Sequence, residues 1–66
     1  MSIVKVIEVI SEGASLEAAI KSGVEEAAKT VDEIKQINVC HIEGIVEKNK
    51  IKKYRINAKI SFLVKR

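Results

Sequence analysis

Residues 52–62 read KKYRINAKISF, and this stretch decides the fold because its side chains alternate strictly between two rows. One row is apolar (Tyr54, Ile56, Ala58, Ile60 and Phe62) and the other is polar (Arg55, Asn57, Lys59 and Ser61). Successive side chains of a strand point to opposite faces, so this alternation is typical of a strand buried on one face. We therefore predict a strand over residues 51–64, whose polar row contacts water, a ligand or another subunit.

Three further segments precede this strand. Residues 3–10, IVKVIEVI, are mostly β-branched and predict a buried strand that ends at SEGAS. Ser15 is a suitable N-cap, and a 3–4 spacing of apolar residues then predicts a helix over about 15–33. The apolar positions are Leu16, Ile20, Val24, Ala27, Val31 and Ile34. Residues 35–47 predict another strand, with a tight turn at Asn49 and a bulge or bend at Gly44.

The order of these segments defines the fold class. A strand, a helix and two further strands predict a single α+β domain over residues 1–66, with β-α-β-β topology. Residues 35–47 and 51–64 form a hairpin. An all-antiparallel sheet then requires residues 51–64 in the middle, which gives the strand order 1-3-2. Such a sheet is expected to wrap partly around the one helix.

Size and composition restrict how this domain is stabilised. A chain of 66 residues buries only about 60% of its unfolded surface and is marginal when alone. Cys40 is the only cysteine and His41 the only histidine, so neither an internal disulfide nor a structural zinc site is expected. No metal is therefore predicted. The lone cysteine, and the lack of a long apolar run or signal pattern, favour a cytoplasmic protein that does not enter a membrane.

The first strand is apolar on both faces, which predicts self-association. Ile3, Ile7 and Val9 fall on one face, and Val4, Val6 and Ile10 fall on the other. One helix covers only one face of a three-stranded sheet, and burying each such side chain is worth about 1.5–3 kcal/mol. We expect another copy to cover the second face, and the alternative is that the chain ends fold over it.

Charge is distributed unevenly along the chain. Residues 1–34 carry three Lys against seven Asp and Glu, a net charge of −4; residues 35–66 carry nine Lys and Arg against two Glu, a net charge of +7. This asymmetry is compatible with nucleic-acid binding, or with an acidic helix beside a basic sheet. Two aromatic residues in the whole chain disfavour nucleic acid, because single-strand binders usually use several.

Catalytic chemistry is not expected. The sequence contains no nucleophile–base pair, no constellation of paired carboxylates and no phosphate-binding glycine loop. Cys40 and His41 are adjacent on a strand and are expected to project to opposite faces, so His41 would not act as a base for Cys40. The cluster of Lys48, Lys50, Lys52 and Lys53 is most often a solvated turn, although it could also form an anion-binding patch.

Several segments together resemble the dodecin family. They are VKVIEVI at 4–10, AAKTVDEI at 27–34, INV at 37–39 and YRINAKISF at 54–62. The resemblance covers nearly the whole chain and implies a three-stranded sheet partly wrapped around one helix. It also implies a hollow homododecamer of cubic symmetry that binds small molecules. Its better-known members store or sequester flavins as stacked pairs, without turnover.

The resemblance also identifies two candidate cofactor-binding residues. Where flavin-binding members have a stacking Trp and a hydrogen-bonding Gln, this chain has Gln36 and Arg55. It is more similar to the subgroup without the Trp, the calcium dodecins. Binding of a flavin (FMN, riboflavin or FAD) is therefore expected to be weak or altered, since Gln36 has no aromatic face. The alternative for both residues is a polar lining or an inter-subunit contact.

The polar row raises one further hypothesis. Arg55 and Lys59 are expected to help fix assembly or bind an anion, since symmetry copies of like charge would otherwise repel. Acidic neighbours such as Glu8 or Glu43 are the expected counter-charges. A small basic nucleic-acid-binding protein, or a purely structural oligomer, is the alternative function.

Overall fold

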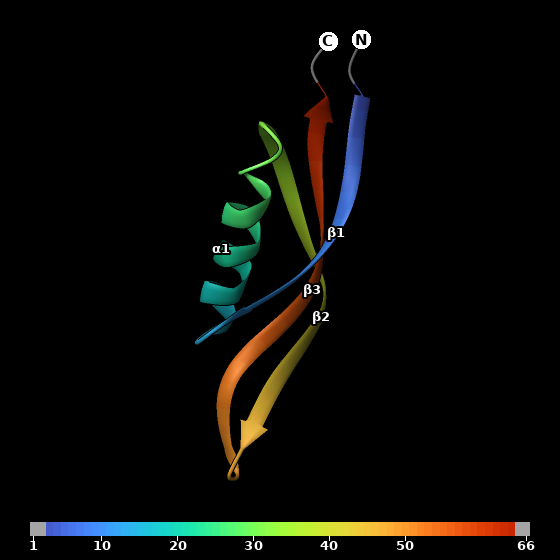
Figure 1. The fold of residues 1–66 in the computed structure, drawn as a ribbon. Helices are drawn as coiled ribbons and strands as arrows, with labels where there is room; N and C mark the ends of the chain where they lie inside the picture. Colours follow the sequence, from blue (N-terminus) through green and yellow to red (C-terminus); the bar gives the residue numbers. More distant parts are fainter. Residues whose placement is uncertain (1–2, 65–66) are drawn as a thin grey trace.

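The computed structural model describes residues 3–64, which form three strands and one helix. They are β1 (Ile3–Gly13), α1 (Leu16–Ala27), β2 (Glu33–Glu47) and β3 (Lys50–Val64). The sheet is antiparallel with the order β1-β3-β2, and α1 lies across one of its faces (Figure 1). The predicted fold class and strand order are therefore confirmed.

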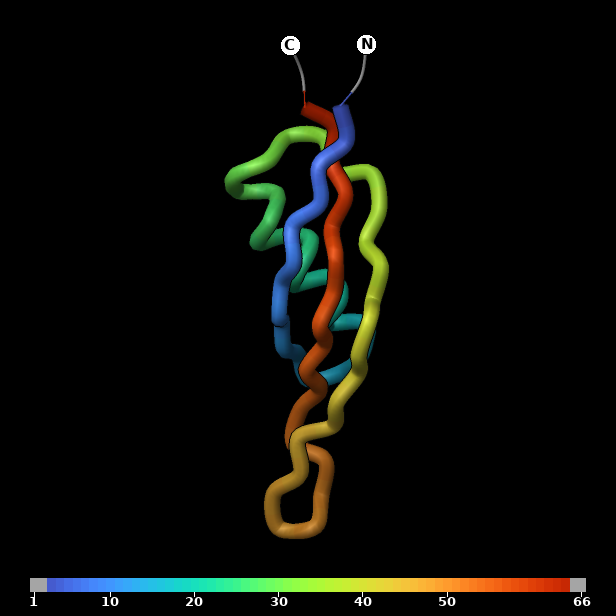
Figure 2. The backbone as a smooth tube through the Cα atoms, turned by 90° about the vertical axis from the view of Figure 1, so that its right-hand side faces the viewer, coloured from blue at the N-terminus to red at the C-terminus, as the bar shows by residue number. Residues whose placement is uncertain are grey.

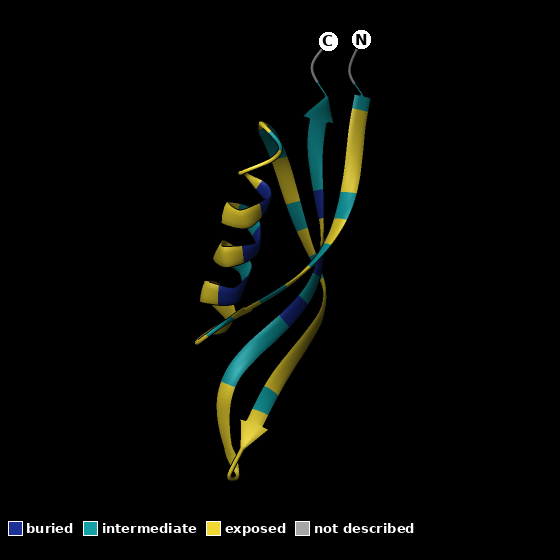
Figure 3. Ribbon diagram, in the orientation of Figure 1, coloured by how far each residue is buried: buried dark blue, intermediate teal, exposed yellow. Residues whose placement is uncertain are grey.

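The apolar row of β3 forms the centre of the core, as its alternation predicted. Ile56, Ala58 and Ile60 are fully buried, and Ala19 of α1 packs against the first two. Half-buried side chains from the neighbouring elements complete this cluster: Val9, Ile20, Ile37 and Val39. Burial is confined to the layer between α1 and the sheet (Figure 3).

Small residues allow α1 to approach β1 closely. A Cβ at Gly13 would lie 2.5 Å from the Ala19 nitrogen, and a Cβ at Gly23 would lie 2.9 Å from the Ser11 hydroxyl. That hydroxyl donates a 2.7 Å hydrogen bond to the Ala19 carbonyl, which links β1 to the helix backbone. Ser15 caps the helix by accepting from the Ala18 amide at 3.1 Å, as predicted.

The predicted helix was too long at its C-terminal end. The structure ends α1 at Ala27, and the amides of Thr30 and Val31 both bond to the Ala27 carbonyl and close a terminal turn. Ile34 continued the helical spacing in sequence, but it pairs with Phe62 inside the sheet instead. Ile34 is β-branched and favours a strand over a helix, so it joins the β2–β3 ladder and α1 ends before it.

Two other boundaries differ from the sequence prediction. β1 continues through Gly13 rather than stopping at residue 10, because its pairing with β3 persists to Tyr54. Gly44 pairs regularly with Tyr54 and forms no bulge. The β2–β3 register instead shifts between Ile34 and Gln36, between Val39 and His41 and between Ile45 and Val46.

The tight turn is confirmed, and Lys48 and Asn49 both have positive φ (53° and 64°), as a two-residue hairpin of type I′ requires.

The β2–β3 hairpin extends well beyond α1 and beyond the end of β1 (Figure 2). A helix of 12 residues spans about 18 Å, whereas the molecule is 52 Å long. The accessible surface is 5053 Å², against roughly 4,200 Å² expected for a folded monomer of 7.3 kDa. The isolated chain therefore exposes more surface than a self-sufficient domain of its mass.

Candidate functional site

The sheet face directed away from α1, which we call the open face, carries the candidate site. Strand pairing arranges its side chains in cross-strand rows, each with one residue from β1, β3 and β2. From the chain ends toward the hairpin, the rows are Val6–Ser61–Gln36, Glu8–Lys59–Asn38, Ile10–Asn57–His41 and Glu12–Arg55–Glu43. The polar row of β3 therefore runs down the middle of the open face.

Arg55 is held by an acidic residue of β1. Its Nε and Nη2 atoms each lie 2.8 Å from Oε2 of Glu12, and the Nζ of Lys53 lies 2.9 Å from Oε1 of the same carboxylate. The hydrogen bond from Lys53 and then that from Arg55 lower the pKa of Glu12 below its usual value of 4.5. Acidic counter-charges were predicted, but Glu12 was not among them.

Arg55 also lines two hollows. One, of about 280 Å³, lies over the row of Ile10, Asn57 and His41, and includes Glu43 and Ile56. The other, of about 550 Å³, lies at the β1 edge and is lined by Ile10, Ser11, Glu12, Ser22, Glu26 and Arg55. Arg55 is therefore common to both hollows, and a ligand in either one would meet a cation that is only partly neutralised, because Glu12 shares its single charge between Arg55 and Lys53.

Gln36 lies at the other end of the open face. It pairs with Ser61, six residues along β3 from Arg55, which corresponds to roughly 20 Å. Both side chains are on the same face, but no small ligand could contact both within one chain. A site that uses Gln36 and Arg55 together would therefore combine residues from two copies.

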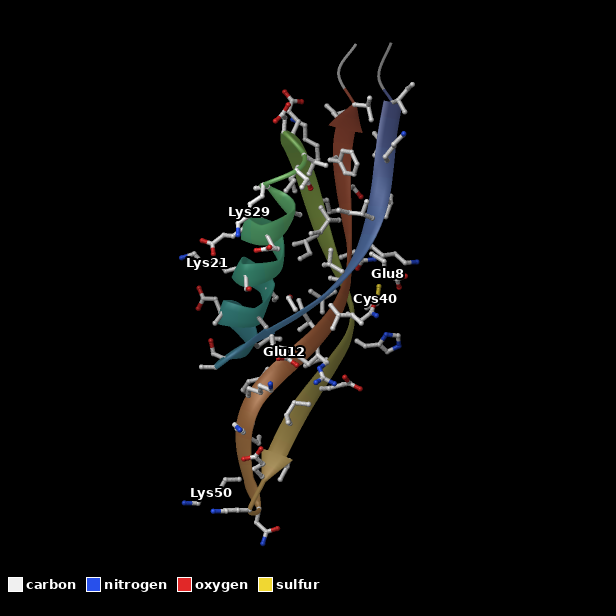
Figure 4. The ribbon with its side chains drawn as sticks, viewed as in Figure 1. Glu8, Glu12, Lys21, Lys29, Cys40 and Lys50 are labelled. Carbon is white, nitrogen blue, oxygen red and sulfur yellow. The ribbon has the colours of Figure 1, made fainter. Side chains whose placement is uncertain are left out.

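The bulge in β2 places Cys40 and His41 differently from the prediction. Val39 pairs with Ala58 on the helix side, and His41 pairs with Asn57 on the open face, so Cys40 is the extra residue. Cys40 lies on the open face with Glu8 (Figure 4), and its thiol contacts the Asn38 carbonyl at 3.6 Å. The two residues therefore share a face, because the bulge interrupts strict alternation.

The open face is also unusually apolar along β1. Val4, Val6 and Ile10 are 59%, 56% and 67% exposed. Two acidic residues lie on the same face of β1, Glu8 after Val6 and Glu12 after Ile10, so the strand presents both apolar and acidic side chains there. This edge is suited to a protein partner that offers both apolar and basic groups.

The part of the chain that the structure describes has neither a metal-binding cluster nor a membrane-spanning helix. Among residues 3–64, no three or more His, Cys, Asp and Glu side chains form a group that could hold a metal ion. Within the same residues, no helix is long and apolar enough to cross a membrane. Cys40 and His41 have no orienting carboxylate hydrogen-bonded to them in the described structure.

These features define a class of small β-α-β-β proteins whose sheet has one face covered by the helix and the other left open. The sequence model of the Dodecin family matches residues 3–65. The chain belongs to the dodecin family.

Comparison with solved structures shows the same fold. A variant of the Thermus thermophilus dodecin superposes with a TM-score of 0.93 and 24% identity over 100% of both chains. The dodecin of Streptomyces davaonensis gives 0.92 and 17%, covering 98% of this chain and 97% of that one. The dodecin of Streptomyces coelicolor gives 0.91 and 18%, covering 98% and 94%. No curated protein matches the sequence.

Proposed function

We propose that this protein assembles into a homododecameric shell whose open faces meet at subunit junctions and bind a small molecule there, without turnover. The observation that carries this proposal is the exposure of Val4, Val6 and Ile10 on the face opposite the helix. Because these side chains are already partly buried, covering the rest of them is worth about 3–5 kcal/mol per copy, which is close to the lower end of a small domain's stability. Membership of the dodecin family supports the same assembly.

The ligand class follows from the residues at the two ends of the open face. Gln36 offers an amide with no aromatic surface, and Arg55 is already bonded to Glu12. A flavin would lose the stacking contact that a Trp provides, worth on the order of 1 kcal/mol beyond area. We therefore propose that riboflavin, FMN or FAD binds weakly, and that the site has been altered toward another polar small molecule.

The proposed location in the cell is the cytoplasm. Cys40 is free and exposed. An exposed thiol is more compatible with a reducing compartment than with an oxidising one.

A native mass measurement with analysis of released small molecules tests this function. The expected result is about twelve times the chain mass, with a non-covalently bound small molecule that leaves on denaturation. A folded monomer with no bound molecule would contradict both parts. Retention on immobilised nucleic acid that falls steeply with salt would instead favour the basic-protein alternative.

A further inference from the structure

The smaller hollow on the open face, over Asn57 and His41, is lined by a carboxylate that has no partner. Glu43 lines this hollow of about 280 Å³ and lies directly opposite Arg55 in the β2–β3 register. The Arg55 guanidinium nevertheless bonds to Glu12, on the other neighbouring strand. Within residues 3–64, the Glu43 side chain makes neither a hydrogen bond nor an ion pair. Glu43 therefore adds an uncompensated negative charge to the hollow.

The cation that lines the same hollow is only partly compensated. Glu12 divides its single charge between Arg55 and Lys53. Nε and Nη2 of Arg55 bond to Glu12, whereas Nη1 makes no hydrogen bond to any of the described residues and can donate to a ligand. The two cations balance the two carboxylates of Glu12 and Glu43. A ligand without net charge therefore suits this hollow better than a simple anion or cation.

Three kinds of side chain reach the hollow from three different strands. Ile10 of β1 is 67% exposed, Arg55 and Asn57 lie on β3, and His41 and Glu43 lie on β2. From β1 to β2, a ligand would meet an apolar surface, then a cation with an amide, and then a carboxylate with an imidazole. Neighbouring strands are about 4.8 Å apart, so one small molecule can contact all three.

The size and lining of the hollow disfavour a planar cofactor. Its volume lies just below the range of roughly 300–1,000 Å³ that is typical for drug-sized ligands. None of the described residues that line it is Trp, Tyr or Phe, so a planar ring would find no aromatic stacking partner. Where open faces meet in the proposed assembly, Glu43 would lose water, and a buried unpaired charge is costly. An ammonium group on the ligand removes that cost.

We propose that this hollow binds a zwitterionic α-amino acid with an aliphatic side chain. The carboxylate of the ligand bonds to Arg55 and Asn57, its ammonium group bonds to Glu43, and its side chain contacts Ile10. Charge-assisted hydrogen bonds at both ends fix the orientation of the ligand. This inference rests on the proposed function and names the ligand class for the same site.

Isothermal titration of the assembled wild-type protein with L-leucine and two truncated analogues tests the ligand class. 4-Methylpentanoate lacks the ammonium group and 3-methylbutan-1-amine lacks the carboxylate, but both keep the aliphatic group. Because each charged end contributes a charge-assisted hydrogen bond, L-leucine should bind at least about tenfold more tightly than either analogue.

Substitutions separate the two charged ends. Glu43→Gln should weaken L-leucine binding at least about tenfold and should not weaken binding of 4-methylpentanoate, which has no ammonium group. Arg55→Gln should weaken binding of both. Glu25→Gln, which removes an exposed carboxylate of α1 outside the hollow, is the matched control and should change neither affinity.

Two outcomes would overturn the ligand class and leave the proposed function standing. One is a wild-type assembly of intact mass that does not bind L-leucine, or binds it no more tightly than the analogues. The other is a Glu43→Gln variant that binds L-leucine as the wild type does but forms smaller species, which would assign Glu43 to a basic side chain of a neighbouring copy. A wild-type monomer would instead remove the proposed function itself.

Discussion

The Glu12 carboxylate bonds to Arg55 across the β1–β3 ladder, with its Oε2 atom 2.8 Å from both Nε and Nη2 of the guanidinium. This pair lies in the last row of the open face before β1 ends. The carboxylate also accepts from Lys53, so one acidic side chain ties two basic residues of β3 to β1. Arg55 is therefore a structural partner of Glu12 before any ligand arrives.

Because of Glu12, the thermal stability of the protein should fall at acidic pH. Its pKa in the folded protein is lowered by hydrogen bonds from Lys53 and Arg55, so the stabilisation is complete above its usual value of 4.5 and is lost as pH falls through the lowered value. Glu12→Gln should therefore lower Tm at pH 7, and the difference from wild type should shrink below pH 4.5.

Thermal unfolding from pH 7 to pH 3 measures this effect. Glu25→Gln, which removes an exposed carboxylate from α1, is the matched control and should leave the acid profile unchanged. If Glu12→Gln and Glu25→Gln gave the same profile, the pairing with Arg55 would contribute nothing in solution.

Flavin affinity should rise when the two altered positions are restored. Gln36→Trp supplies an aromatic face and should tighten binding roughly fivefold to tenfold, given about 1 kcal/mol for stacking. Adding Arg55→Gln should tighten it further, because a neutral donor replaces a cation held by Glu12. Quenching of riboflavin fluorescence on titration gives both affinities. Wild-type quenching at nanomolar concentration would show that Gln36 does not weaken the site.

The close contact between α1 and β1 predicts a non-additive pair of substitutions. Gly23→Ala should lower Tm in the wild type, because the new Cβ lies 2.9 Å from the Ser11 hydroxyl and displaces its bond to Ala19. In a Ser11→Ala background the nearest remaining atom is the residue 11 Cβ at 3.6 Å. There Gly23→Ala should stabilise by up to about 1 kcal/mol, through its helix propensity. Additive effects in chemical denaturation would contradict this packing.

Substitutions in the hairpin turn at residues 48–49 should raise the thermal stability of the protein. Lys48 holds a φ of 53°, a left-handed conformation that costs a residue with a Cβ about 1 kcal/mol. Replacing residues 48–49 with Asn-Gly, the preferred pair for a type I′ turn, should raise Tm by a few degrees. Alanine at both positions should lower Tm. The opposite order in differential scanning calorimetry would contradict the turn type.

Local periodicity in the sequence was sufficient to predict most of the fold. The alternation in β3 predicted the burial of Ile56 and Ile60, and the order of the elements in an antiparallel sheet predicted its central place. The helix boundary could not be predicted in the same way. Ile34 fits the helical spacing as well as it fits a strand, and only its pairing with Phe62 decides between them.

The contact between Glu12 and Arg55 depends on the register between β1 and β3, which the local sequence pattern of either strand does not encode. Glu12 and Arg55 are 43 residues apart in sequence, and they meet only because β1 continues past residue 10. Extending the alternation of Glu8 and Ile10 by two residues would have placed Glu12 on the open face. The bulge at Cys40 carried no glycine signal, so the shared face of Cys40 and His41 could not be predicted.

Self-association through the open face is tested most directly at Val6. Val6 is 56% exposed and lies on the open face opposite Ser61. Val6→Asp should therefore leave the chain's own core intact. Ile7 pairs with the buried Ile60 on the helix side, so a charge there would disrupt folding instead. Glu25→Lys, on the exposed surface of α1 and outside both hollows beside Arg55, is the matched control.

Light scattering coupled to size exclusion, with circular dichroism of the same fractions, is the decisive measurement. We expect about twelve chain masses for the wild type and for Glu25→Lys, and a much smaller species for Val6→Asp, because a buried unpaired charge at each copy costs several kcal/mol. A folded wild-type monomer, or a Val6→Asp assembly of unchanged mass, would contradict it.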